Sequence, residues 1–413
     1  MRVWCGAWLF VRISADNAPW VTPAVDADLF RRIRDQVAVV GIGHLPFAKD
    51  IGRPIADTAV EAIQLALDDA GLQAEDVNGM VMFEMEKTHE VSIARRLGAE
   101  NLAWWSKISY GGGASAATIM QAAAAIASGL ADVVVCHRAR NRGARASAPW
   151  MQERELAMDD KALHSPWGLI RPVDVIGMWA HRHMHQYGTT REHLGNVAIA
   201  ARKHARNNPF ALMGQRPLDM STYLAGRVIG FPLTLYDCCL ETDGALACVV
   251  TSVERARDLR HKPVLVHSVA QASGPNPVHL ANYNNTTDML TTAAFCAERL
   301  WQRSELKAKD MQCAQIYDAF TPLVISGLED YGFCKRGEGG PFTDGGRIEL
   351  GGALPVLTSG GGLSEAYVHG FNLILEGVRQ IRGTSVNQVP DCRATLVTGA
   401  SGVATSAVVF RGE

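Results

Sequence analysis

The sequence lacks the features that mark several specialised classes of protein. Its nine cysteines form no CxxC pair, and no apolar run is long enough to span a bilayer. The 40 basic and 42 acidic residues nearly cancel, which leaves a formal net charge of -2 and no field to attract nucleic acid or an anionic membrane. Arg12 interrupts the only apolar stretch near the start, so a secretory signal is not predicted. We therefore expect a cytoplasmic protein with neither nucleic acid nor membrane as a partner.

The chain is long and has the composition of a globular protein. The 413 residues are 47% hydrophobic and 20% charged, enough for two packed domains or one large duplicated domain. Residues 1–36 are expected to form a poorly ordered leader. The first strong element is the strand "VAVVGIG" at Val37–Gly43. Pro46 stands where a dinucleotide-binding fingerprint needs its third glycine, which argues against that type of site.

The chain contains two pairs of similar segments in the same order. A helix, an alanine-and-acid loop and a strand occur from residue 57 and again from residue 291. A glycine triplet, a serine, a long helix and an apolar strand follow in both places, beginning at Ser109 and Thr358. This repetition indicates a duplicated α/β unit, with halves at 37–260 and 261–413 and a structured insertion at about 138–235.

Five motifs stand out along the chain: "HQYGTT", "ARNNPFA", "YDCCLETDGA", "YDAFTP" and "SGGGLSEAY". They resemble motifs of the thiolase superfamily, specifically of the sterol-carrier-protein-x and lipid-transfer-protein branch. The resemblance covers the chain from Val37 onward. It implies a five-layered αβαβα fold, a homodimer and chemistry on an acyl-CoA thioester.

The reactive positions of that family are altered. The stretch "YGGGASA" at Tyr110–Ala116 has no cysteine where the family has its nucleophile, and "VTGASG" at Val397–Gly402 lacks the second thiol. Tyr317 and Tyr367 stand where the family has histidines. Thiolysis needs a nucleophile to hold the acyl group and a thiol to manage the enolate, so the usual thiolase route is not expected.

The two tyrosines suit a substrate that carries a β-hydroxyl group. Retro-aldol cleavage leaves no acyl group on the enzyme and needs a base for the hydroxyl and an acid for the α-carbon. A phenol can donate and accept, so we predict Tyr317 and Tyr367 as the acid–base pair, without deciding which is the base.

The motifs "YDAFTP", "CKRGEGGPF" and "SGGGLSEAY" are most similar to those of steroid side-chain-cleaving aldolases. That resemblance implies a 17-hydroxy steroid side-chain CoA thioester as substrate, with a 17-keto steroid and a short acyl-CoA as products. It also implies a small zinc-ribbon and OB-fold acyl-CoA-binding partner in an α2β2 complex. No cofactor is expected, because CoA is part of the substrate.

Other residues are candidates for supporting roles. Asp318 is expected to buttress the loop or act directly, and His369 to cap the following helix or act directly. Arginines between Arg138 and Arg145 could hold CoA phosphates, although a solvated or interface loop is the stronger interpretation. No metal site is predicted, since only His181 and His185 share a helix face. The candidates for substrate or oxyanion contacts are Tyr110, Gly112, Gly113, Tyr283, Gly361 and Gly399.

Three alternatives remain open at this level. A conventional thiolase would need a catalytic cysteine, and candidates such as Cys238 and Cys334 lie in the wrong motifs. A non-catalytic lipid- or acyl-CoA-binding subunit would keep the fold and lose the chemistry. An acyltransferase would leave the missing acyl carrier unexplained.

Overall fold

The computed structural model describes residues 30–83, 88–141, 165–275 and 288–413. Most of the expected leader, residues 1–29, lies outside that part. Residues 30–36 were assigned to the same leader, yet they pack on the second half of the chain. Ile33 is 6% exposed, the Arg34 guanidinium donates to Arg303 O at 2.7 Å, and Asp35 N donates to Val266 O at 3.1 Å. The packed body therefore begins before Val37.

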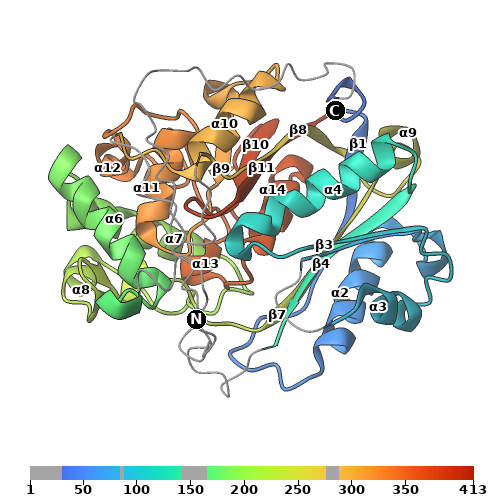
Figure 1. Ribbon diagram of the computed structural model, residues 1–413, viewed down its shortest axis with the longest axis horizontal. Coiled ribbons are helices and arrows are strands. Elements are labelled where there is room, and N and C mark those ends of the chain that lie inside the picture. The colour runs from blue at the N-terminus through green and yellow to red at the C-terminus, as the bar shows by residue number, and fades with distance from the viewer. Residues whose placement is uncertain (1–29, 84–87, 142–164, 276–287) are drawn as a thin grey trace, which may run out of the picture.

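The first half is a mixed sheet covered by helices (Figure 1). Its strand order is β3-β2-β4-β7-β1, with β2, β3 and β4 parallel and β7 antiparallel to both β4 and β1. The elements of this half are β1 (Val37–His44), α2 (Ile55–Ala70), β2 (Gly79–Phe83), α3 (Glu90–Leu97), β3 (Trp104–Ile108), α4 (Ser115–Ala127), β4 (Val133–Arg140), β7 (Gly244–Ser252) and α9 (Val253–Ala256).

The second half repeats this strand order. It runs β8-β11-β10-β9, and a parallel bridge between Ala314 and Val356 stands in the place of the missing outer strand. The two half-sheets join where Ala38 and Val39 of β1 pair with β8. The elements are β8 (Val264–Ala272), α10 (Thr292–Gln302), β9 (Cys313–Gln315), α11 (Thr321–Asp330), α12 (Gly339–Phe342), α13 (Gly361–Ser364), α14 (Phe371–Arg382), β10 (Ala394–Thr398) and β11 (Thr405–Gly412).

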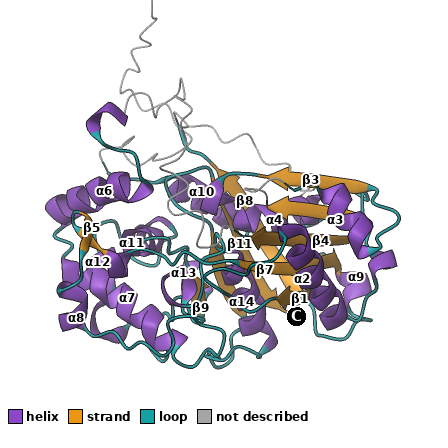
Figure 2. Cartoon of the chain, turned by 90° about the horizontal axis from the view of Figure 1, so that it is seen from below, coloured by secondary structure: helices purple, strands orange, loops and turns teal. Residues whose placement is uncertain are grey.

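Helices α4 and α14 occupy the middle of the molecule, where each packs against strands of both halves (Figure 2). Helix α4 is rich in alanine, which allows this close double contact. Helix α2 covers the outer face of the first half, and α10 packs on β8 and β11. The glycines of "VVGIG" serve the packing of α2, because an added Cβ at Gly43 would lie 2.4 Å from Ala62 O.

The insertion forms a helical unit beside α11 and α13. It contains α6 (Pro172–Tyr187), α7 (Arg191–Ala205), α8 (Met220–Leu224), β5 (Val228–Gly230) and β6 (Leu233–Thr234). Its expected start at residue 138 is too early, because β4 pairs with β7 as far as Arg140 and Gly244. No helix in the described residues is long and apolar enough to cross a membrane.

Candidate active site

Tyr317 and Tyr367 meet although they lie 50 residues apart in the chain. Tyr317 follows β9, and Tyr367 lies in the loop between α13 and α14. Their hydroxyl oxygens are 2.5 Å apart and share a hydrogen bond, and their rings cross at 68°. Tyr317 is 3% exposed, whereas Tyr367 is partly exposed. A substrate arriving from solvent would therefore reach Tyr367 first.

Thr398, Gly112 and Gly370 hold Tyr317 in place. Its N–H donates to Thr398 Oγ1 at 3.0 Å, at the end of β10. Its hydroxyl fills the space left by Gly112, where an added Cβ would lie 1.9 Å from the phenol oxygen. An added Cβ at Gly370 would likewise lie 2.8 Å from the Tyr317 ring. Burial raises the pKa of the Tyr317 phenol, and the neighbouring Tyr367 raises it further.

Tyr367 is fixed through its backbone by residues of the first half. Its N–H donates to Thr242 Oγ1 at 2.8 Å, and that hydroxyl lies 3.0 Å from Tyr367 O. The Arg140 Nη1 group also donates to this carbonyl, at 3.1 Å, and its guanidinium carbon lies 5.6 Å from the ring centre. Burial raises the pKa of the Tyr367 phenol, while the Tyr317 hydrogen bond and the charge of Arg140 lower it.

Asp318 supports the turn that leads to Tyr367. Its carboxylate accepts hydrogen bonds from Gly362 N at 2.8 Å and Leu363 N at 2.9 Å. Gly361 has a φ of 57°, and an added Cβ there would lie 2.3 Å from Asp318 Oδ2. Burial raises the pKa of Asp318 to about 7, against the two backbone hydrogen bonds that lower it. Asp318 thus anchors α13, as the buttress interpretation predicts, and Gly361 allows its close approach.

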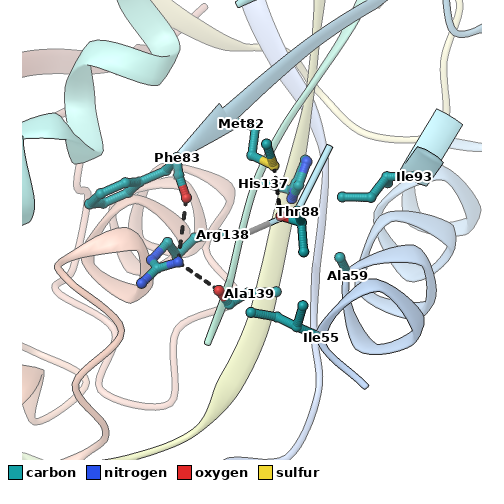
Figure 3. Close-up of a pocket in the computed structure, with 9 residues that line it drawn as sticks. All are labelled: Ile55, Ala59, Met82, Phe83, Thr88, Ile93, His137, Arg138 and Ala139. Carbon is teal, nitrogen blue, oxygen red and sulfur yellow. Dashed lines mark hydrogen bonds between the residues drawn. The ribbon is translucent and has the colours of Figure 1, made fainter. Parts of the chain in front are cut away.

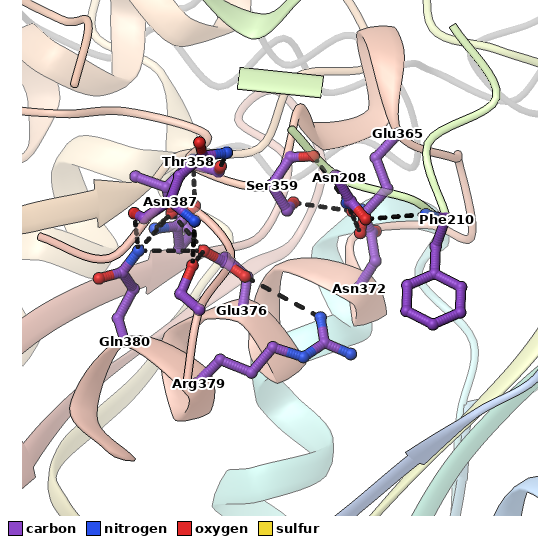
Figure 4. Close-up of polar contacts among 12 residues, drawn as sticks. Asn208, Phe210, Thr358, Ser359, Glu365, Asn372, Glu376, Arg379, Gln380 and Asn387 are labelled. Atoms are coloured by element: carbon purple, nitrogen blue, oxygen red, sulfur yellow. Dashed lines mark hydrogen bonds and ion pairs between the residues drawn. The ribbon is translucent and has the colours of Figure 1, made fainter. Parts of the chain in front are cut away.

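Glu365 was missed by sequence reasoning, although it lies in the quoted "SEAY" motif. Its buried carboxylate accepts hydrogen bonds from Asn208 Nδ2 at 3.0 Å, Ser359 Oγ at 2.7 Å and Asn372 Nδ2 at 2.8 Å (Figure 4). Burial raises its pKa to about 7. An acid within an otherwise small and apolar turn was the signal that could have revealed this anchor.

His369 does not cap α14. The N-cap position belongs to Gly370, and no side chain bonds there. His369 instead has a φ of 53° and turns its ring toward Tyr367, with 4.9 Å between the ring centres. Its Nδ1 lies 3.2 Å from Arg138 Nη2. Because a guanidinium can only donate, Nδ1 accepts and the ring proton lies on Nε2.

The glycine triplet of the first half packs against the "VTGASG" loop of the second half. Ala400 N donates to Gly112 O at 3.0 Å, and an added Cβ at Gly399 would lie 3.0 Å from Gly113 O. Tyr110 precedes the triplet and is 51% exposed. Tyr283 falls outside the described residues. Among the predicted substrate contacts that the structure describes, Gly112 lies directly against the Tyr317 hydroxyl.

Arg138 and Arg140 belong to the core of the site. The stronger sequence interpretation placed them in a solvated or interface loop, but they are 1% and 4% exposed on β4. Arg138 lines a cavity of about 10 Å³ that also contacts Phe83 and Ala139 (Figure 3). That volume holds about one water molecule, so the cavity cannot admit a substrate.

Cys238 and Cys334, the two cysteines considered as a thiolase nucleophile, do not suit that role. Burial raises the pKa of both Cys238 and Cys334 to about 12, so neither forms a thiolate readily near neutral pH. Across the residues that the structure describes, no cluster of three or more His, Cys, Asp or Glu side chains could hold a metal ion. The site thus brings two phenols together, with the Asp318 carboxyl and the His369 ring near them.

Comparison with known proteins identifies the family. Residues 276–410 match the Thiolase C-terminal domain-like family. The chain is 44% identical over 381 residues to 17-hydroxy-3-oxo-4-pregnene-20-carboxyl-CoA lyase of Mycobacterium tuberculosis, covering 91% of this chain and 99% of that protein. It belongs to the thiolase-like steroid side-chain-cleaving aldolases. This family also includes the Steroid side-chain-cleaving aldolase of Thermomonospora curvata, which is 43% identical over 91% of this chain and 98% of its own length.

Solved structures agree with this assignment. The Ltp2-ChsH2(DUF35) aldolase has a TM-score of 0.86 and 42% identity, covering 92% of this chain and 98% of that chain. Human mitochondrial 3-ketoacyl-CoA thiolase shares the fold at a TM-score of 0.64 and 14% identity, covering 92% of this chain and 98% of that chain. The thiolase-like α/β fold and its duplication are confirmed. The chain is a carbon–carbon lyase of this fold.

Proposed function

We propose that the protein cleaves the CoA thioester of a 17-hydroxy steroid side chain by a retro-aldol reaction. The products would be a 17-keto steroid and a short acyl-CoA such as propionyl-CoA or acetyl-CoA. The observation that carries the proposal is the hydrogen-bonded pair Tyr317 and Tyr367, at 2.5 Å, in a site without a thiolase cysteine. The names of the two relatives support the substrate class.

Tyr367 serves as the base in this proposal, since it is the more exposed member of the pair. Its phenolate takes the proton of the substrate hydroxyl, and the carbonyl forms as the carbon–carbon bond breaks. The bond electrons move into the thioester enolate, whose α-carbon then takes a proton from the tyrosine pair. Tyr317 donates its hydrogen bond to the Tyr367 phenolate. Every atom of the products comes from the substrate, so the reaction calls for no cofactor.

We propose two partners, one from the comparison with a solved structure and one from an exposed strand. The name of the Ltp2-ChsH2(DUF35) aldolase supports a small DUF35-type partner, which we propose is the acyl-CoA-binding zinc-ribbon and OB-fold protein of an α2β2 complex. Strand β3 is an outer strand of the sheet, and its Trp105 is 56% exposed. An exposed edge with a large apolar side chain favours pairing with a second copy of this chain.

The test is to purify the chain with its partner and incubate the complex with a 17-hydroxy steroid side-chain CoA thioester. Mass spectrometry should show a 17-keto steroid and an acyl-CoA, formed without consumption of free CoA. A requirement for free CoA would indicate thiolysis. Absence of cleavage by a folded complex, over several side-chain lengths, would instead support a binding subunit.

We place the reaction in the cytoplasm, in keeping with the eight unpaired cysteines among the described residues.

A further inference from the structure

Arg140 is a buried cation without an acidic partner. It is 4% exposed, and no Asp or Glu among the described residues forms an ion pair with it. Arg382 and Arg336 have such partners, Asp69 at 2.7 Å and Glu329 at 2.9 Å, whereas the buried Arg202 donates to Ser364 Oγ and Arg216 O. A buried charge is costly unless it is paired. The position of Arg140 therefore suggests that an anion forms beside it at some stage of the reaction.

The group beside Arg140 is Tyr367. The guanidinium lies over the phenol ring, 5.6 Å from its centre, and Nη1 holds the Tyr367 carbonyl at 3.1 Å. The face of an aromatic ring already attracts a cation, and a phenolate attracts it more strongly because it carries a full negative charge. Arg140 is thus placed to favour the ionised form of this residue.

The other groups around Tyr367 act on its ionisation in different directions. Tyr317 lowers the pKa of Tyr367 through the shared hydrogen bond, whereas the Cys239 thiol and the Asp318 carboxyl raise it. His369 faces the ring from the same loop. The charged and titratable groups that surround the Tyr367 phenol are Tyr317 and Asp318 after β9, Cys239 before β7, Arg140 on β4, and His369.

We propose that Arg140 is a positioning residue that supplies the counter-charge for a Tyr367 phenolate, the form that accepts the proton of the substrate hydroxyl. This inference rests on the proposed retro-aldol function and adds a residue that the tyrosine assignment does not contain. Arg140 acts through Tyr367 and does not itself exchange a proton. Its charge, more than its hydrogen bond to the carbonyl, is the property that the reaction uses.

The experiment compares Arg140→Gln and Arg140→Lys with the wild-type complex. Glutamine keeps an N–H donor for the Tyr367 carbonyl and removes the charge, while lysine keeps the charge. We expect Arg140→Gln to lower kcat at least about tenfold with little change in KM, because one pKa unit of the base corresponds to a tenfold change in its ionised fraction. The rising limb of log(kcat/KM) against pH should move to higher pH. Arg140→Lys should restore most of the rate.

The pH profile should move to higher pH because removing a cation raises the pKa of a neighbouring phenol. Less phenolate is then present at any pH below that pKa. Burial raises the pKa of Asp318 to about 7, and Arg140 is not among the main causes of that shift, so the ratio of each variant to wild type isolates Arg140. Arg382→Gln is a matched control, because this buried arginine pairs with Asp69 instead. It should lower the melting temperature and leave the pH profile unmoved.

An unchanged pH profile in folded Arg140→Gln would overturn the inference, as would equal losses in the Gln and Lys variants or a loss confined to KM. If the Gln variant does not fold, the Lys variant decides alone, because a folded Arg140→Lys enzyme with less than about a tenth of the wild-type kcat contradicts the role of charge. Inactivity of the wild-type complex would refute the proposed function instead.

Discussion

Gly112 and Tyr317 share one space, since the phenol oxygen occupies the volume that a Cβ at residue 112 would need. The two atoms would lie 1.9 Å apart, far inside any allowed contact. The glycine comes from the first half of the chain and the tyrosine from the second. The distance between the Tyr317 and Tyr367 hydroxyls therefore depends on the absence of a side chain in the opposite half.

Gly112→Ala should displace the Tyr317 hydroxyl and lower kcat/KM at least about tenfold, because an active-site shift of about 1 Å can cost a hundredfold in rate. Gly412→Ala is a suitable control, since its Cβ would meet only Ile381 at 3.8 Å. Steady-state assays and melting curves of both variants provide the comparison. Wild-type activity in Gly112→Ala would show that the pair tolerates a changed Tyr317 position.

Replacing either tyrosine by phenylalanine tests the acid–base assignment directly. Tyr317→Phe and Tyr367→Phe should each lower kcat about a hundredfold or more, the usual contribution of a general acid or base. Tyr331→Phe is the matched control, because Tyr331 is 1% exposed and its hydroxyl lies beside the Cys296 thiol instead. Near-normal turnover in both catalytic variants, measured by product release, would remove the pair from the mechanism.

The buried carboxyl of Glu365 should make stability depend on pH. Its pKa is raised to about 7 in the fold, so the folded state retains a proton that the unfolded chain releases near the ordinary glutamate pKa of 4.5. Its contribution to stability is therefore lost progressively as pH rises from about 4.5 to 7. We expect Glu365→Gln to become more stable relative to wild type across this interval, as measured by urea unfolding. Glu305→Gln, at an exposed site, should show no such trend.

Trp105 tests the proposed pairing of two chains through β3. Its indole is 56% exposed on the outer strand of the sheet, so a carboxylate there would place charge in an apolar contact. Trp105→Glu should halve the mass measured by light scattering, whereas Trp167→Glu, at an 83% exposed residue of the insertion, should not. A complex of unchanged mass in Trp105→Glu would place the interface elsewhere.

The repeated halves were accessible from the sequence because they rest on local patterns in a fixed order, and the Tyr317–Tyr367 pair through motifs that resemble those of thiolases. The positions of Arg138 and Arg140 could not be predicted from the sequence. Four arginines within "RARNRGAR" indicate a charged loop, and only the structure, in which β4 continues to Arg140 with all its residues buried, places the first two inside the sheet. The Thr242 contact to Tyr367 joins residues 125 apart, and no local pattern reports such a contact.

Backbone groups hold the two halves together around the site. Ala400 N bonds Gly112 O, while Ser406 Oγ accepts from Ala117 N at 2.9 Å and donates to Gly113 O at 2.6 Å. These bonds use main-chain atoms of the glycine triplet and α4, so they do not depend on which side chain carries out the reaction. A scaffold joined in this way can exchange its reactive residues while keeping its shape, which fits a fold that this carbon–carbon lyase shares with human mitochondrial 3-ketoacyl-CoA thiolase at 14% identity.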